Sequence, residues 1–201
     1  EQIEQYKQKF GNFGRAISPI PDTFRRLVDR ETITIGNNYW QVIVGRGHSP
    51  EHACLFCADQ NLLISGDQLL PTISSNVSVF PTEPMADPLA DWLRSLSYLK
   101  DQVPADVLVL PAHGRPFRGA HTRLDALIAE HEACLDDLLA HCHNPRRVID
   151  TFPALFKSPI RDSNLIMATG ESIAHLNYLI NQGEIQRSED AERIHWYEAR
   201  R

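Results

Sequence analysis

Short apolar runs separated by turn-forming residues predict a first half of the chain that is rich in β-strands. Gly36-Asn37-Asn38 lies between two of these runs and is typical of a tight β-hairpin. A second hairpin is predicted around Ala58-Asp59-Gln60-Asn61, and the wholly apolar run that ends before Pro111 predicts one more strand. The predicted strands cover residues 32–35, 39–44, 53–57, 62–64 and 107–110.

Apolar residues at helical spacing predict helices between and after these strands. One helix begins at Asp87 or Pro88 and runs to about Lys100, and beyond Gly119 the pattern is mainly helical. Three helices followed by a hairpin is the order of elements in a winged-helix module. We therefore predict an α/β protein with two domains, residues 1–120 and a small, mostly helical, winged-helix-like domain of residues 121–201. The other predicted helices are 1–15, 123–142, 148–156 and 164–181, and the hairpin joins 184–187 to 193–197.

Composition narrows the class of protein without naming a function. With 201 residues, 42% of them hydrophobic, the chain can bury the core of one domain plus a small appendage. A formal net charge of -6 disfavours a broad nucleic-acid-binding surface, and no apolar run approaches the roughly 18 residues of a membrane span. Cys54 and Cys57 lie three apart on a predicted strand and point to opposite faces. We expect the four cysteines to be reduced thiols of a cytoplasmic protein.

Three potential metal ligands each lie beside a glycine at the end of a predicted strand. His48 lies in Gly47-His48-Ser49-Pro50, Asp67 in Ser65-Gly66-Asp67, and His113 in Pro111-Ala112-His113-Gly114. Imidazole and carboxylate groups suit Zn²⁺ or another borderline cation. A catalytic zinc takes about three protein ligands and a pair of zincs takes more, so these residues predict half of a metal site.

With these motifs the chain resembles the metallo-β-lactamase-fold hydrolases over roughly residues 30–120. The family's Gly-His-Thr-Pro segment is similar to Gly47-His48-Ser49-Pro50, which makes His48 a ligand of the first metal by resemblance. Asp67 is similar to the aspartate that bridges two metals, where it also helps orient the attacking water. His113 is similar to the histidine that binds the second metal. The resemblance therefore implies two zinc ions in a complete site, with Asp67 as the catalytic residue.

One family signature, His-x-His-x-Asp-His, does not occur in the sequence. The resemblance begins about midway through a typical member, and it implies the C-terminal half of an αββα sandwich. We therefore expect this chain to be the C-terminal portion of a longer metal-dependent hydrolase and to be inactive by itself. The longer protein is expected to cleave a small-molecule ester or thioester, or a phosphodiester.

The segment Leu70-Pro71-Thr72-Ile73-Ser74-Ser75-Asn76-Val77 and the winged-helix-like tail resemble the lactamase-like-2 branch of the family. That branch makes an endoribonuclease the second hypothesis, although acidic residues around the tail disfavour contact with nucleic acid. A third hypothesis is a non-catalytic binding or assembly module that keeps the fold. A truncated sandwich leaves apolar strand faces uncovered, so we expect the chain to associate with itself, by dimerisation or by swapping through the N-terminal helix region.

The other histidines divide into two groups. His52, four residues after His48, is either a hydrogen-bonding partner of the metal site or a polar residue at the edge of a hairpin. The remaining six are expected to be solvated or partly packed: His121, His131, His141, His143, His175 and His195.

Overall fold

A five-stranded mixed sheet forms the first part of the computed structural model, which describes residues 23–200. The predicted helix at residues 1–15 lies outside this range. Neighbouring strands are antiparallel, except that β4 and β5 run parallel. The strands pair in sequence order, β1 (Thr32–Ile35), β2 (Asn38–Gly45), β3 (His52–Cys57), β4 (Leu62–Gly66) and β5 (Leu108–Pro111). All five predicted strands are therefore confirmed, with ends that shift by one or two residues.

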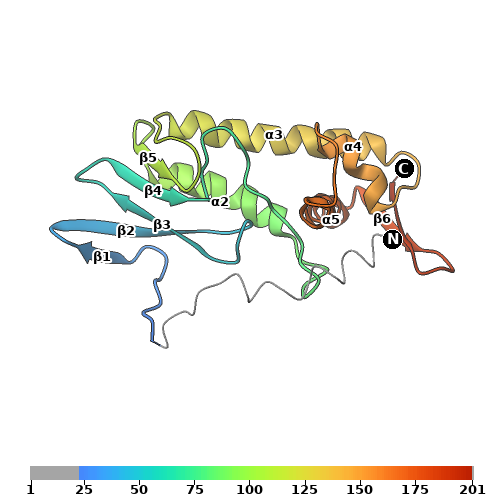
Figure 1. Ribbon diagram of the computed structural model, residues 1–201, viewed down its shortest axis with the longest axis horizontal. Coiled ribbons are helices and arrows are strands. Elements are labelled where there is room, and N and C mark those ends of the chain that lie inside the picture. The colour runs from blue at the N-terminus through green and yellow to red at the C-terminus, as the bar shows by residue number, and fades with distance from the viewer. Residues whose placement is uncertain (1–22, 201) are drawn as a thin grey trace.

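Two helices lie on one side of this sheet (Figure 1). Helix α2 (Pro88–Gln102) connects β4 to the parallel strand β5, and its N-terminus is capped by Asp87, whose carboxylate accepts a hydrogen bond from the amide of Ala90. Helix α3 (Ala120–His141) follows β5 and runs along the top of the view from the sheet to the C-terminal elements. The sequence prediction of a helix start at Asp87 or Pro88 is confirmed.

The C-terminal part consists of short helices, one longer helix and a hairpin. The helix predicted over 148–156 is instead a 3₁₀ turn, η2 (Val148–Thr151), followed by the short α4 (Phe152–Leu155). Pro153 lacks an amide hydrogen and suits the first turn of a helix, so it begins a new helix rather than continuing the preceding turn. Helix α5 (Leu165–Asn181) follows, and then the hairpin of β6 (Ile185–Glu189) and β7 (His195–Ala199). The order of elements agrees with the prediction, while the winged-helix assignment and the division at residue 120 stay predictions.

One continuous hydrophobic core joins the sheet to the helices. It contains Ile43 and Leu63 from the sheet, Leu96 from α2, Leu127 from α3 and Leu176 from α5. All of these side chains are at most 1% exposed. Within residues 23–200 no helix combines the length and apolar character needed to cross a bilayer.

The opposite face of the sheet carries a row of apolar side chains that is less well covered. Leu55, Ile64 and Leu110 are neighbours on β3, β4 and β5. Leu55 and Leu110 are half-buried, and Ile64 is 39% exposed. This row is the apolar surface on which the expected self-association depends.

Candidate metal site

The sheet brings the three predicted ligands to one end of its strands. β2, β4 and β5 point the same way, so the residues that follow them meet at one edge of the sheet. His48 follows β2, Asp67 follows β4 and His113 follows β5. A hydrogen bond of 3.0 Å from the amide of Ala112 to the carbonyl of Gly66 ties the last two turns together.

Two glycines in these turns are required by close contacts. Gly47 has φ +106, and a Cβ atom on it would lie 2.5 Å from Cβ of Trp92 in α2. Gly66 has φ +55, and a Cβ atom there would lie 2.3 Å from Nε2 of His52. The glycines beside the predicted ligands therefore let the turn before His48 pack on α2 and let His52 pack against the turn before Asp67.

The carboxylate of Asp67 lies between the two histidines. Oδ2 of Asp67 is 3.8 Å from Nε2 of His48, and Oδ1 of Asp67 is 3.4 Å from Nε2 of His113. The backbone of Asp67 is held in turn by the hydroxyl of Ser75, which donates to its carbonyl over 2.5 Å. His48 and Asp67 are about one-third exposed, whereas the side chain of His113 is 69% exposed. The structure thus brings all three predicted residues together, with a different oxygen of Asp67 facing each imidazole.

A hydrogen bond to the backbone of Asn76 fixes the orientation of the His48 ring. Its Nδ1 lies 2.8 Å from the backbone carbonyl of Asn76. A carbonyl oxygen can only accept, so Nδ1 carries the hydrogen and the lone pair of the neutral ring lies on Nε2. That nitrogen is the one that faces Asp67. Metal-ligating histidines almost always donate their other ring N–H to a carboxylate, a backbone carbonyl or water, and a backbone carbonyl is the acceptor for His48.

The donor set agrees with zinc chemistry, although it is incomplete. Two ligands of one tetrahedral zinc, each bound at about 2.0–2.1 Å, lie about 3.4 Å apart. The His113–Asp67 distance of 3.4 Å equals that separation, and the His48–Asp67 distance of 3.8 Å is somewhat longer. Among residues 23–200, however, no three or more His, Cys, Asp or Glu side chains form a group that could hold a metal ion. The residues form two ligand pairs, His48 with Asp67 and His113 with Asp67. Each pair has fewer than the three protein ligands that a catalytic zinc takes.

His52 lies beside this site. Its ring centroid is 6.4 Å from that of His48, in an edge-on arrangement. Burial and the neighbouring His48 lower the pKa of His52, while Asp67 and a backbone hydrogen bond at Ser65 act in the opposite direction. His52 therefore lies against His48 and the turn before Asp67, and the choice between its two sequence interpretations stays a prediction.

Two of the six remaining histidines are buried, contrary to the expectation that they are solvated or partly packed. His131 of α3 is 5% exposed and His175 of α5 is 2% exposed, with 3.3 Å between Nδ1 of His131 and Nε2 of His175. Nε2 of His131 lies 3.0 Å from the hydroxyl of Ser74, and Nδ1 of His175 lies 2.9 Å from the carbonyl of Glu171. Both rings lie on the faces that α3 and α5 bury against each other. These hydrogen bonds make burial possible without charge.

Burial lowers the pKa values of the two histidines and raises that of the neighbouring Glu171. Burial, with His175 as a second cause, lowers the pKa of His131 to about 4, and burial lowers that of His175 as well. Burial also raises the pKa of Glu171 to about 7, against the effect of a hydrogen bond from Asn76. Asn76 stands in the sequence only as part of the segment 70–77 that resembles one branch of the family, and Glu171 has no signal of its own, because a lone carboxylate carries no local spacing pattern.

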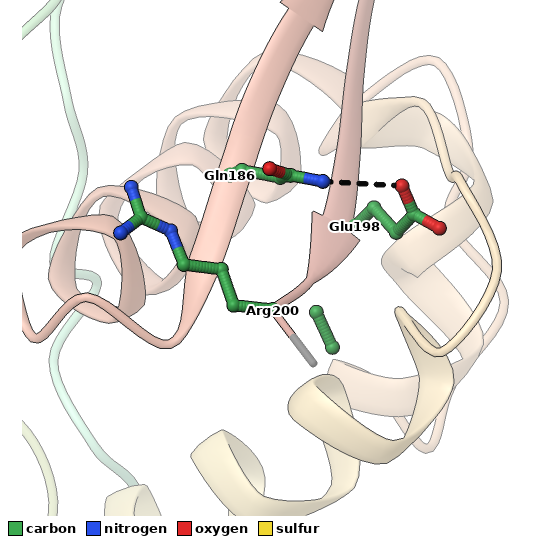
Figure 2. Close-up of a pocket in the computed structure, with 4 residues that line it drawn as sticks. Gln186, Glu198 and Arg200 are labelled. Atoms are coloured by element: carbon green, nitrogen blue, oxygen red, sulfur yellow. Dashed lines mark hydrogen bonds between the residues drawn. The ribbon is translucent and has the colours of Figure 1, made fainter.

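A surface hollow lies elsewhere, on the C-terminal hairpin (Figure 2). It is lined by Gln186, Glu198, Ala199 and Arg200, and its one hydrogen bond between labelled residues joins the amide of Gln186 to the carboxylate of Glu198 over 3.3 Å. None of the three predicted metal ligands lines it. We assign it no part in the candidate site.

Two family models match the chain. The model described as metallo-beta-lactamase superfamily matches residues 2–113, which include His48, Asp67 and His113. The model described as metallo-beta-lactamase-like, C-terminal domain, matches residues 135–200. Comparison with curated proteins gives no match.

Solved structures agree with these family models. A beta-lactamase domain protein from Burkholderia ambifaria is 36% identical, with a TM-score of 0.90 over 99% of this chain and 59% of that chain. A metallo-beta-lactamase family protein from Thermus thermophilus is 28% identical, with a TM-score of 0.78 over 90% of this chain and 56% of that chain. The chain thus spans somewhat more than half the length of these two proteins.

Proposed function

The chain belongs to the metallo-beta-lactamase superfamily, and from this membership we propose that it carries the second half of the binuclear metal site of a hydrolase. In this proposal His48 would hold one metal, His113 would hold the other, and Asp67 would contribute to holding both. The ligands of the first half belong to a longer polypeptide. The missing His-x-His-x-Asp-His signature and the coverage of 59% of the Burkholderia ambifaria protein support this part of the proposal.

The position of Asp67 is the observation that carries the proposal. Each of its carboxylate oxygens faces a different imidazole, at 3.4 Å and 3.8 Å. With Nδ1 of His48 donating to Asn76, an Nε2 lone pair faces an anionic oxygen, and a cation between them relieves the repulsion of the two acceptors. Zinc is the cation we propose, because imidazole and carboxylate together suit it.

The proposed reaction is hydrolysis of an ester, thioester or phosphodiester. Two bound metals supply activated water and polarise the scissile carbonyl or phosphoryl group. The residues of this chain would hold the metals on one side, and Asp67 would orient the attacking water. A small ester or thioester is our preferred substrate, because a net charge of -6 opposes binding of a nucleic-acid backbone. The free thiols at Cys54, Cys57, Cys134 and Cys142 agree with the cytoplasmic location that we include in the proposal.

Metal analysis of two polypeptides tests the proposal. The chain as it stands and a version extended upstream are dialysed against Zn²⁺, and the bound metal is measured together with hydrolysis of ester and thioester substrates. We expect the extended protein to hold two zinc ions and to hydrolyse at least one substrate, and the present chain to bind zinc weakly and to be inactive. An extended protein that binds no metal and hydrolyses no substrate contradicts the hydrolase proposal and favours a binding or assembly module.

Matched substitutions locate the metal. Asp67→Asn and His113→Gln should each lower zinc binding by the extended protein, because each removes a proposed ligand. Asp59→Asn and His143→Gln change the same residue types at exposed positions and should leave zinc binding unchanged. Equal zinc binding by all four variants would rule out this ligand assignment.

A further inference from the structure

We propose that helix α5 holds His48 in its metal-binding orientation through Asn76, with Glu171 and Asn76 as positioning residues. The inference rests on the proposed function, since it concerns the imidazole assigned there as a metal ligand. It adds a role for the C-terminal part of the chain, which contributes none of the three proposed ligands.

A chain of contacts links α5 to the imidazole. The side-chain amide of Asn76 donates to Oε2 of Glu171 over 2.7 Å, and the backbone carbonyl of the same Asn76 accepts from Nδ1 of His48 over 2.8 Å. Asn76 is therefore held by α5 on its side-chain side and holds His48 on its backbone side. Glu171 and Asn76 are 95 residues apart in sequence.

The neighbouring residues keep α5 close to this segment. The amide of Val79 donates to the carbonyl of Gly170 over 3.0 Å, and the hydroxyl of Ser78 contacts the carbonyl of Met167 over 3.3 Å. A Cβ atom on Gly170 would lie 2.8 Å from Cβ of Ser78, so only glycine permits this approach without a shift. The position of the carbonyl of Asn76 is thus set by the surface of α5.

The consequence for His48 is a single tautomer. While the carbonyl of Asn76 stays in place, the hydrogen of a neutral ring remains on Nδ1 and the metal-binding nitrogen is Nε2. If segment 74–78 detaches from α5, the ring is free to exchange between tautomers and to turn. Mutation of a residue that hydrogen-bonds to a metal ligand typically lowers metal affinity by about ten- to a hundredfold.

Nuclear magnetic resonance of the full chain at pH 8 without metal tests the inference, since the ¹⁵N shifts of the ring distinguish the two tautomers. The wild type should show Nδ1–H at His48. Glu171→Gln retains an oxygen that accepts from Asn76 and should leave this signal unchanged. Glu171→Leu removes the acceptor and should give a mixture of tautomers, and Asn76→Ala, a smaller change, should do the same if Glu171→Leu does not fold.

Asn181→Ala is the matched control. Asn181 also lies on α5, and its amide donates over 2.8 Å to Asp87, the residue that caps α2, rather than to Asn76. This variant should keep the Nδ1–H signal. The inference is overturned if the wild type carries the hydrogen on Nε2, if Glu171→Leu and Asn76→Ala both keep Nδ1–H, or if Asn181→Ala alters the ring as much as they do.

A second measurement separates this inference from the proposed function. Zinc titration of the same substitutions in the version extended upstream should show an affinity about tenfold lower or more for Glu171→Leu than for Glu171→Gln. If no variant binds zinc while the tautomers follow the expected pattern, the proposed function fails and the positioning of His48 by α5 stands. If all variants bind zinc equally and the tautomers do not respond, the metal site stands and the positioning role fails.

Discussion

Replacing Glu171 by glutamine should change the way in which the stability of the protein depends on pH. Burial raises the pKa of this carboxyl from 4.5 to about 7 in the folded state. A group whose pKa is raised by folding stabilises the fold most below its unfolded pKa, and this contribution is lost as the pH rises toward the folded pKa. For Glu171 the loss occurs between pH 4.5 and about 7.

His131 acts in the opposite direction over nearly the same range. Burial lowers its pKa from 6.5 to about 4, so its contribution is complete above pH 6.5 and is lost as the pH falls toward 4. Integrated from pH 4.5 to 6.5, each of these two shifts changes the free energy of unfolding by about 2 kcal/mol, with opposite signs. In the wild type these two contributions oppose each other, and His175, whose pKa is also lowered, acts in the same direction as His131.

Urea unfolding at pH 4.5, 5.5 and 6.5 measures the effect as a difference between proteins. The free energy of unfolding of Glu171→Gln minus that of the wild type should rise by about 2 kcal/mol from pH 4.5 to 6.5, because the variant has no carboxyl to ionise. For His131→Gln the same difference should fall by about 2 kcal/mol. Common contributions from other groups cancel in both comparisons.

Glu132→Gln is the control, since Glu132 is exposed on the same helix as His131. Its profile should run parallel to that of the wild type. If the profile of Glu171→Gln also runs parallel to the wild type, the carboxyl of Glu171 is not held in a desolvated site, and the reasoning from its burial is wrong.

Three further predictions concern packing, thiols and association. Gly47→Ala should lower the free energy of unfolding by about 2–4 kcal/mol, because the new Cβ atom would lie 2.5 Å from Cβ of Trp92. Gly36→Ala, with open space around it, should lower the free energy of unfolding by only about 1 kcal/mol. Equal losses for the two variants in urea unfolding would contradict the contact with Trp92. The buried thiol of Cys54, whose pKa burial raises to about 12, should react with a thiol reagent far more slowly than that of the half-buried Cys134, and faster reaction of Cys54 in mass-spectrometric mapping would argue against its burial. We also propose that the chain self-associates through its less covered sheet face, so light scattering should show a mass that rises with concentration, and a constant monomer mass would exclude this.

Much of the fold follows from local sequence signals, and the rest depends on contacts between distant segments. Gly36-Asn37-Asn38 and the apolar runs on either side fix the first hairpin, and Asp87 followed by proline fixes the start of α2. The parallel pairing of β4 with β5 has no such signal, because an apolar run does not indicate which strand lies beside it. The prediction of one helix over 148–156 was wrong at Pro153, although the local sequence carries the signal for a break, since proline favours the first turn of a helix over its interior.

The candidate site shows the same division more sharply. His48, Asp67 and His113 could be selected because each stands beside a glycine at a strand end, and parallel strand directions bring such ends together. Asn76 and Glu171 could not be selected in this way, because their role exists only where α5 meets the segment between β4 and α2 in space.

The segment of residues 70–77, noted in the sequence only for its resemblance to one branch of the family, gains a physical explanation from the structure. Ser74 contacts the buried His131 of α3, Ser75 holds the backbone of Asp67, and Asn76 joins His48 to α5. Val77 is fully buried in the common core and anchors the segment. Consecutive residues thus connect two helices of the C-terminal part to two of the proposed metal ligands. A substitution in this segment should therefore affect both the metal site and the packing of the helices. If the two parts of the chain were independent domains, the same substitution would affect only one of them.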